Sequence, residues 1–209
     1  MKELTLELTS RCQLTCPWCS SYRDTPIDMN FEDVINHLDL AHGEGFSSVR
    51  FSGGEPTLHE YITPIIKHAR TLGFNITLLT NGMNRYFNMG IDKYEIQWQI
   101  FNVHIIKWYN NMCKADNNMS INVVNVTEAH IGPAINFAGR FDIPIHIMKL
   151  QDSGAARLNK KILHEVHISI TGDSGCNYNN KKLIRPDNTI LHCSADKTNN
   201  TCKYCKEQL

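Results

Sequence analysis

Three cysteines near the start of the chain are spaced closely enough to bind one metal centre. Cys12, Cys16 and Cys19 directly follow a segment that is typical of a β-strand. The short spacings let one loop present three thiolates to a [4Fe–4S] cluster, and three ligands on four irons leave one iron open. An open metal position is typical of a site that binds a substrate or cofactor. A zinc ion held by the same cysteines and a distant histidine is the structural alternative.

Four further cysteines lie near the C-terminus and suggest a second site. The last 34 residues contain Cys176, Cys193, Cys202 and Cys205, and four thiolates suit either an iron–sulfur cluster or a structural zinc ion. Because the N-terminal segment has no apolar core of a signal peptide, a disulfide framework is disfavoured. The eighth cysteine, Cys113, has no partner in the sequence pattern and is expected to be a small buried residue.

The elements that must position these groups alternate between strand-like and helix-like segments. Strands are expected at Leu4–Thr9, Ser48–Ser52, Asn75–Thr80, Tyr94–Phe101, Ser120–Val126 and Ile143–Leu150, and helices at Phe31–His42 and Tyr61–Thr71. This alternation predicts an α/β fold with a parallel sheet, and six units are too few to close an eight-stranded barrel. The fold class expected is therefore a partial (β/α)6 parallel barrel.

The expected strands have one apolar and one polar face. In the first strand Leu4, Leu6 and Leu8 alternate with Thr5, Glu7 and Thr9. The apolar face suits the outer helices, so the polar face should line an interior that holds a polar ligand. An antiparallel sheet with one solvated face is the alternative.

After residue 150 the pattern changes. A helix is expected at Ala155–Val166, and Lys181–Arg185 and Thr189–Cys193 should form a β-hairpin around Pro186-Asp187-Asn188. We therefore expect a partial barrel over residues 1–150 and a helix with a small cysteine-rich, cluster-binding extension over residues 151–209.

Two motifs together resemble those of the radical S-adenosylmethionine (SAM) superfamily. The first is Cys12-x3-Cys16-x2-Cys19 with the aromatic Trp18 before the third cysteine, and the second is Ser52-Gly53-Gly54-Glu55-Pro56 after the second expected strand. Each follows a strand of the expected barrel, and they occur in the family's order. The resemblance covers about residues 1–150.

The resemblance implies cofactors and a chemistry. The three cysteines would hold a [4Fe–4S] cluster whose open iron binds SAM. Trp18 would lie near the adenine of SAM. Gly53 and Gly54 would let the backbone approach the methionine moiety, and Glu55 would hold its ammonium group. An electron from the cluster would cleave SAM to methionine and a 5′-deoxyadenosyl radical, which abstracts hydrogen from the substrate. Further candidate cofactor contacts are Asn81, Gln99, Asn102 and Asn125.

The C-terminal cysteines resemble the twitch-type (SPASM-like) auxiliary-cluster domain of some radical SAM enzymes. The resemblance implies a second [4Fe–4S] cluster, with zinc as the alternative, and such a centre could accept an electron from a substrate radical.

The substrate is the least constrained part of the prediction. Equal numbers of basic and acidic residues, 21 each, argue against a polycationic surface that coats nucleic acid. No stretch is apolar enough to span a membrane and no signal-peptide core is seen, so a cytoplasmic protein is expected. The resemblance implies an oxygen-sensitive enzyme. We expect oxidation of a small polar molecule, with the auxiliary cluster as electron acceptor and a flavodoxin or ferredoxin as electron donor. Candidate substrate contacts are Glu7, Gln97, His146, Lys149 and Asp152.

Other functions fit the same motifs. They are a radical isomerase or rearrangement, modification of a peptide or nucleotide, and a non-enzymatic zinc- or cluster-binding interaction module.

Overall fold

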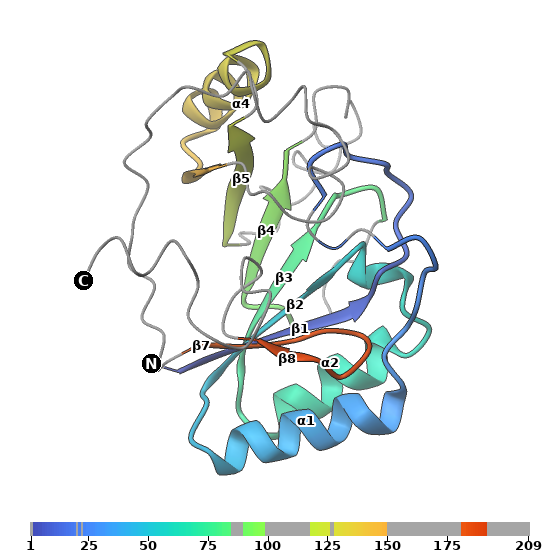
Figure 1. Ribbon diagram of the computed structural model, residues 1–209. Coiled ribbons are helices and arrows are strands. Elements are labelled where there is room, and N and C mark those ends of the chain that lie inside the picture. Colours follow the sequence, from blue (N-terminus) through green and yellow to red (C-terminus); the bar gives the residue numbers. More distant parts are fainter. Residues whose placement is uncertain are drawn as a thin grey trace, which may run out of the picture.

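A twisted sheet, drawn in Figure 1, organises the chain in the computed structural model. The structure describes residues 2–19, 21, 23–84, 90–98, 118–125, 128–149 and 181–191. In chain order its elements are β1 (Glu3–Thr9), α1 (Phe31–Gly43), β2 (Ser48–Gly53), the 3-10 turn η1 (Pro56–Leu58), α2 (Ile62–Thr71), β3 (Asn75–Thr80), β4 (Lys93–Gln97), β5 (Met119–Asn125), α4 (Glu128–Phe141), β6 (Ile145–Lys149), β7 (Lys181–Ile184) and β8 (Ile190–Leu191).

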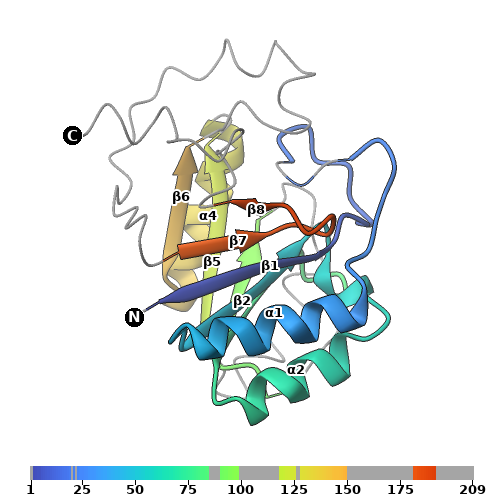
Figure 2. The ribbon, with the colours of Figure 1, turned by 60° about the horizontal axis from the view of Figure 1, so that its bottom comes forward.

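The described strands form one sheet in the order β6-β5-β4-β3-β2-β1-β7-β8. Every neighbouring pair from β6 to β7 is parallel, and β8 pairs with β7 in the antiparallel direction. In Figure 2 the helices α1 and α2 lie side by side along the strands β1 and β2, and α4 lies behind β5 and β6. The sheet remains open, so the prediction of a partial parallel barrel is confirmed and the antiparallel alternative is wrong.

Alternation along β1 determines which side chains face the helices. Leu4, Leu6 and Leu8 are fully buried in the core, as the sequence predicts. The helix α1 begins at the expected place because the side chain of Asn30 accepts a hydrogen bond from the backbone N–H of Glu32 at 2.9 Å. The polar side chains between the leucines are thereby left on the opposite face of the sheet.

The predicted β-hairpin forms and joins the barrel sheet. The strand β7 pairs with β1 from Glu3↔Lys181 to Leu6↔Ile184, so it continues the parallel sheet. The turn that follows contains Asn188, whose φ of 61° lies in the left-handed region that asparagine tolerates. The boundary expected at residue 150 stays a prediction.

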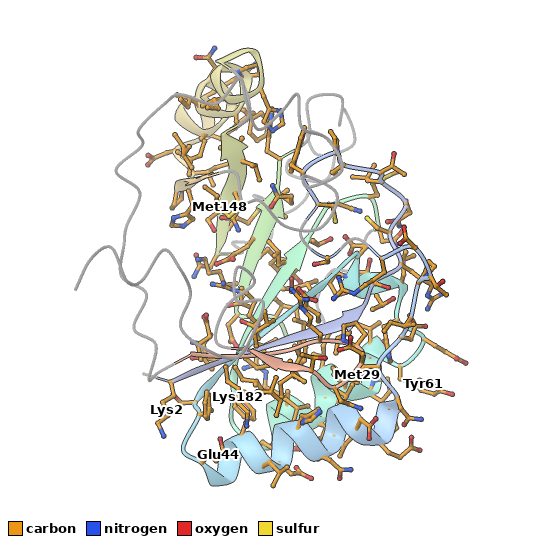
Figure 3. The ribbon with its side chains drawn as sticks, in the orientation of Figure 1. Lys2, Met29, Glu44, Tyr61, Met148 and Lys182 are labelled. Atoms are coloured by element: carbon orange, nitrogen blue, oxygen red, sulfur yellow. The ribbon has the colours of Figure 1, made fainter. Side chains whose placement is uncertain are left out.

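Polar contacts hold the hairpin against α1. Asn188 contacts His37 at 2.9 Å and donates to Asp33 at 2.8 Å. At the other end of the helix, Lys182 forms an ion pair with Glu44 at 3.3 Å, and Lys2 donates to the carbonyl of Glu44 at 2.8 Å. Figure 3 shows Lys2 and Lys182 close to Glu44 at this end of α1.

Some elements differ from those expected. The fourth strand ends at Gln97 instead of Phe101, and the sixth begins at Ile145 instead of Ile143. The helix α4 was not predicted, because Pro133 lies inside it and Gly132-Pro133 is typical of a turn. The expected helix at residues 155–166 lies outside the described residues. No helix in the described part of the chain is long and apolar enough to cross a membrane.

Candidate active site

The three cysteines of the first motif lie on the loop after β1 and border a cavity. None of the three forms a disulfide, and each side chain is partly exposed. The cavity has a volume of about 350 Å³ and extends from this loop along the polar face of the sheet. Besides Cys12, Cys16 and Cys19, its lining includes Trp18, Gly53, Gly54 and Asn81 near the strand ends and Thr5, Glu7, Arg50, Glu95, Gln97, Asn122, Met148 and Lys182 farther along. Side chains from the predicted polar face of the strands therefore line the cavity, as expected.

Two glycines hold the end of β2 against the start of the cysteine loop. A Cβ on Gly53 would lie 2.2 Å from the carbonyl oxygen of Thr9, and one on Gly54 would lie 2.3 Å from that of Arg11. The backbone N–H of Gly54 donates to Thr9 at 2.6 Å, and that of Glu55 donates to Arg11 at 2.8 Å. Glycine is required at both positions because the two segments are in direct backbone contact and leave no room for a Cβ.

An ion pair anchors the same stretch from the outside. The guanidinium of Arg11 donates to both carboxylate oxygens of Asp28, at 2.9 and 2.6 Å, and to the carbonyl of Leu58 at 2.8 Å. Thr9 also donates to Asp28 through its hydroxyl. Partial burial of Asp28 acts to raise its pKa, but the hydrogen bonds from Arg11 and Thr9 outweigh it and hold the pKa below the usual range.

Glu55 does not line the cavity. Its side chain is fully buried, and one carboxylate oxygen accepts hydrogen bonds from the hydroxyls of Thr57 at 2.5 Å and Thr80 at 2.8 Å. The other oxygen accepts the backbone N–H of Asn81 at 2.7 Å. Burial raises the pKa of Glu55, although these donors oppose the rise. In this structure Glu55 joins the ends of β2 and β3, and its expected contact with the ammonium group of SAM stays a prediction.

Asn81 directly follows β3 and reaches the cysteine loop. Its side-chain amide nitrogen lies 3.5 Å from the Sγ of Cys12 and 3.1 Å from the Oε1 of Gln13. Burial raises the pKa of the Cys12 thiol, and hydrogen bonds from Leu14 and Asn81 oppose that rise. A metal bound to Cys12 would stabilise the thiolate against this burial, and the N–H donors of Leu14 and Asn81 would add to that effect.

Trp18 packs against α4. Its ring centroid lies 4.8 Å from that of His130 at an interplanar angle of 58°. His130 is fully buried, and burial lowers its pKa, so the imidazole is neutral at physiological pH. His130 is not among the site residues predicted from the sequence, and its only sequence signal is its place after the fifth expected strand.

On the polar face of β1, Glu7 is buried between the sheet and the loop. Its carboxylate accepts a hydrogen bond from the hydroxyl of Ser21 at 3.0 Å and lies 3.9 Å from the guanidinium of Arg185, which follows β7. Burial raises the pKa of Glu7 even though Arg185 and Ser21 act to lower it. The hairpin thus contributes to the cavity environment, which the sequence did not predict.

A second carboxylate, that of Glu95 on β4, lines the same cavity, but its pKa is shifted in the opposite direction to that of Glu7. Lys93 donates to it at 2.9 Å, Arg50 at 3.3 Å and Asn122 at 3.2 Å. Burial acts to raise the pKa of Glu95, but Arg50 and Lys93 outweigh it and the pKa lies below the usual value. Glu95 lies within the fourth expected strand but is not among the site residues predicted from the sequence.

The remaining predicted site residues have different positions. Gln97 lines the cavity, whereas His146 is exposed and is absent from the lining. Asn125 and Lys149 are register partners at the ends of β5 and β6. The other candidates lie outside the described residues; they are Gln99, Asn102, Asp152, Cys176, Cys193, Cys202 and Cys205.

The residues present fit an iron–sulfur cluster with SAM. Three thiols from one loop border a cavity whose rim also contains exposed backbone from the two glycines. Among the described residues, no three His, Cys, Asp or Glu side chains converge on one metal ion. Ligands of a four-iron cube bind different irons and lie farther apart than the ligands of a single ion.

Comparison with known proteins connects this site to a family. The profile of the radical SAM superfamily matches residues 6–131. Over 85 residues the chain is 39% identical to the PqqA peptide cyclase of Xanthomonas oryzae pv. oryzae (strain MAFF 311018). The aligned stretch covers 37% of this chain and 22% of that protein.

The fold is similar to that of Streptococcus suis SuiB. Its crystal structure bound to the precursor peptide SuiA has a TM-score of 0.71 at 16% identity and covers 97% of this chain and 63% of that chain. The structure bound to SAM has a TM-score of 0.72 at 18% identity and covers 95% of this chain and 61% of that chain. The chain thus spans less than two thirds of the length of these relatives.

These relatives correct one expectation from the sequence. The predicted oxidation of a small polar molecule, with a small-molecule partner, is wrong, because the relatives are a peptide cyclase and a protein bound to a precursor peptide. The alternative of peptide modification agrees with them.

Proposed function

Because the chain belongs to the radical SAM superfamily, we propose that it is an enzyme that modifies a peptide by abstracting a hydrogen atom from one of its residues. The observation that carries this proposal is the cysteine loop at the rim of a polar cavity. When bound, the cluster supplies the electron that cleaves SAM to methionine and a 5′-deoxyadenosyl radical. The protein's part is to position the cofactor and the target C–H bond and to exclude water.

The peptide substrate is supported by the relatives and tested by isotope transfer. PqqA peptide cyclase is named for a peptide, and SuiB binds one. In the test, the reconstituted enzyme, SAM and dithionite are incubated with a pool of fully deuterated synthetic peptides. Deuterium in the 5′-deoxyadenosine formed is expected. Unlabelled product from the peptide pool, with labelled product from a pool of deuterated sugars and amino alcohols, would contradict the proposal.

Cys12, Cys16 and Cys19 are proposed as the cluster ligands. Replacing any one by alanine should lower the iron content after anaerobic reconstitution and reduce formation of 5′-deoxyadenosine by about 100-fold or more. Cys113→Ala serves as the matched control and should keep both, since Cys113 lies far from the motif in sequence. Normal activity in Cys16→Ala would reject the ligand assignment.

Around the cluster, the proposed cofactor contacts have separate tasks. The backbone of Gly53 and Gly54 borders the cavity beside the cysteine loop, where the methionine moiety of SAM would bind. Trp18 offers a ring face for the adenine, and His130 packs against that ring. Glu55 acts here by holding the strand ends, since its carboxylate is buried among Thr57, Thr80 and Asn81.

A second, twitch-type cluster bound by Cys176, Cys193, Cys202 and Cys205 is part of the proposal. Its support in the described residues is the β-hairpin, because β8 ends two residues before Cys193. Metal analysis tests it: two [4Fe–4S] clusters give about eight irons per chain, and the double variant Cys202→Ala/Cys205→Ala should retain about four. About four irons with one zinc in the unmodified protein would instead identify a structural zinc site.

A further inference from the structure

Asn81 occupies a special position between a buried carboxylate and the cysteine loop. It is the first residue after β3, its side chain is 5% exposed, and it lines the cavity together with Cys12. Its backbone N–H donates to Glu55 at 2.7 Å, and the hydroxyl of the preceding Thr80 donates to the same carboxylate at 2.8 Å. These hydrogen bonds hold the backbone of Asn81 close enough to the cysteine loop for its side chain to contact that loop.

The hydrogen bonds also determine which way the amide faces. The Oδ1 of Asn81 accepts the backbone N–H of Met83 at 2.9 Å. The Nδ2 then faces the loop, with the Oε1 of Gln13 at 3.1 Å and the Sγ of Cys12 at 3.5 Å. A flipped amide would place an oxygen against the Gln13 oxygen and the sulfur, and would remove the acceptor for Met83. Three contacts therefore agree on an N–H that is directed at Cys12.

An N–H donor at a cluster thiolate affects the electron affinity of the cluster. Reduction adds negative charge that is shared by the sulfur ligands, and a hydrogen bond to a more negative acceptor is stronger. Hydrogen bonds to the sulfurs are one of the factors that set the reduction potential of iron–sulfur clusters. The donor thus stabilises the reduced state more than the oxidised one.

We propose that Asn81 is a positioning residue whose side-chain amide donates a hydrogen bond to the Cys12 thiolate and raises the reduction potential of the cluster. The proposal rests on the assignment of Cys12 as a cluster ligand. It gives Asn81 a task toward the cluster, in place of the cofactor contact expected from the sequence.

The test compares Asn81→Leu, which keeps the branched shape without the donor, with Thr80→Val as a matched control. Thr80→Val removes the neighbouring hydrogen bond to Glu55 and leaves the Asn81 amide in place. Both variants and the unmodified enzyme are reconstituted, and their midpoint potentials are measured by EPR-monitored potentiometry. In Asn81→Leu the equilibrium constant for one-electron reduction should fall about tenfold, which is about 59 mV. Thr80→Val should keep the original potential.

Two results would overturn the proposal. One is a fully loaded Asn81→Leu enzyme with the original potential, and the other is an equal shift in Thr80→Val, which would indicate general loosening of the strand ends. If Asn81→Leu does not hold iron, a second measurement uses the unmodified enzyme. This enzyme is labelled with asparagine that carries ¹⁵N in its side-chain amide. A hyperfine coupling from that nitrogen to the reduced cluster is expected, and its absence overturns the proposal.

The failure of this inference differs from a failure of the proposed function. An unmodified chain that holds no cluster and cleaves no SAM would reject the function itself. A loaded, SAM-cleaving enzyme whose potential does not depend on Asn81 would reject the inference alone.

Discussion

The backbone N–H of Gly54 donates a hydrogen bond to the carbonyl of Thr9 at 2.6 Å, and this contact joins the two sequence motifs. Gly54 directly follows β2, and Thr9 ends β1 three residues before Cys12. Since the two backbone segments cannot separate without losing this hydrogen bond, the position of Thr9, from which the cysteine loop continues, is fixed relative to β2. The glycine motif therefore has a structural task toward the cysteines in addition to any contact with a cofactor.

The first prediction concerns Gly54→Ala. A Cβ at Gly54 would lie 2.3 Å from the carbonyl oxygen of Arg11, so the two backbones must separate. We expect a loss of about 3 kcal/mol or more in the free energy of unfolding and a lower iron content after reconstitution. Urea unfolding and iron analysis measure both effects.

Gly43→Ala is the control, because a Cβ there meets nothing within 4 Å and the residue lies in α1. It should be neutral or stabilising by up to about 1 kcal/mol. Equal stability and iron content in the two variants would show that the contact at Gly54 does not constrain the loop.

The second prediction concerns the buried carboxylate of Glu55. Glu55→Ala leaves the donors of Thr57, Thr80 and Asn81 without their acceptor, each at a cost of about 1–3 kcal/mol. We expect a total loss of about 3 kcal/mol or more in urea unfolding, and a smaller loss for Glu55→Gln, which keeps one acceptor oxygen.

Glu60→Ala provides the comparison, since Glu60 is exposed and lies only five residues after Glu55. Its stability should change by less than about 0.5 kcal/mol. A loss in Glu55→Ala no larger than in Glu60→Ala would contradict the role given to Glu55.

The third prediction is a pH dependence with opposite signs for two carboxylates. Burial raises the pKa of Glu7, so the folded protein binds its proton more tightly than the unfolded chain does. Its contribution to stability is therefore present below the unfolded pKa of about 4.5 and decreases as the pH rises through the raised value. Glu7→Gln cannot ionise and should lose less stability than the unmodified protein between pH 4.5 and 8.

For Glu95 the sign is reversed. Burial acts to raise its pKa, but Arg50 and Lys93 outweigh it, so its contribution is present above pH 4.5 and is lost as the pH falls through the lowered pKa. Glu95→Gln should be less stable than the unmodified protein at pH 7 by about 1–3 kcal/mol and should lose less on acidification. Urea unfolding across the pH range measures both variants, and the same pH slope in both would refute the distinction.

The fourth prediction concerns the ring of Trp18. If it contacts the adenine, Trp18→Ala should raise the dissociation constant of SAM about three- to tenfold, and Trp18→Phe should have a smaller effect. Equilibrium binding to the loaded enzyme measures this. Trp98→Phe is the control, because Trp98 packs against Phe137 at 5.3 Å and does not line the cavity. Unchanged affinity in Trp18→Ala would remove Trp18 from the cofactor site.

Much of the fold follows from local patterns in the sequence. The leucines at positions 4, 6 and 8 alternate with polar residues, and this period of two determines both the strand and its buried face. Asn30 marks the start of α1 because its side chain accepts the N–H of Glu32. In contrast, α4 was missed, because Pro133 lies inside it and its packing against the sheet overrides the local signal.

The candidate site divides in the same way. The spacing of the three cysteines and the paired glycines are local features, so the sequence alone determined the family and the loop that would bind the cluster. The folded structure was needed to show that Glu55 is buried between strand ends, that the Asn81 amide lies near Cys12, and that Arg185 reaches Glu7. These pairs are far apart in the chain, and their contacts depend on how the strands are ordered and registered in the sheet, which no local pattern encodes.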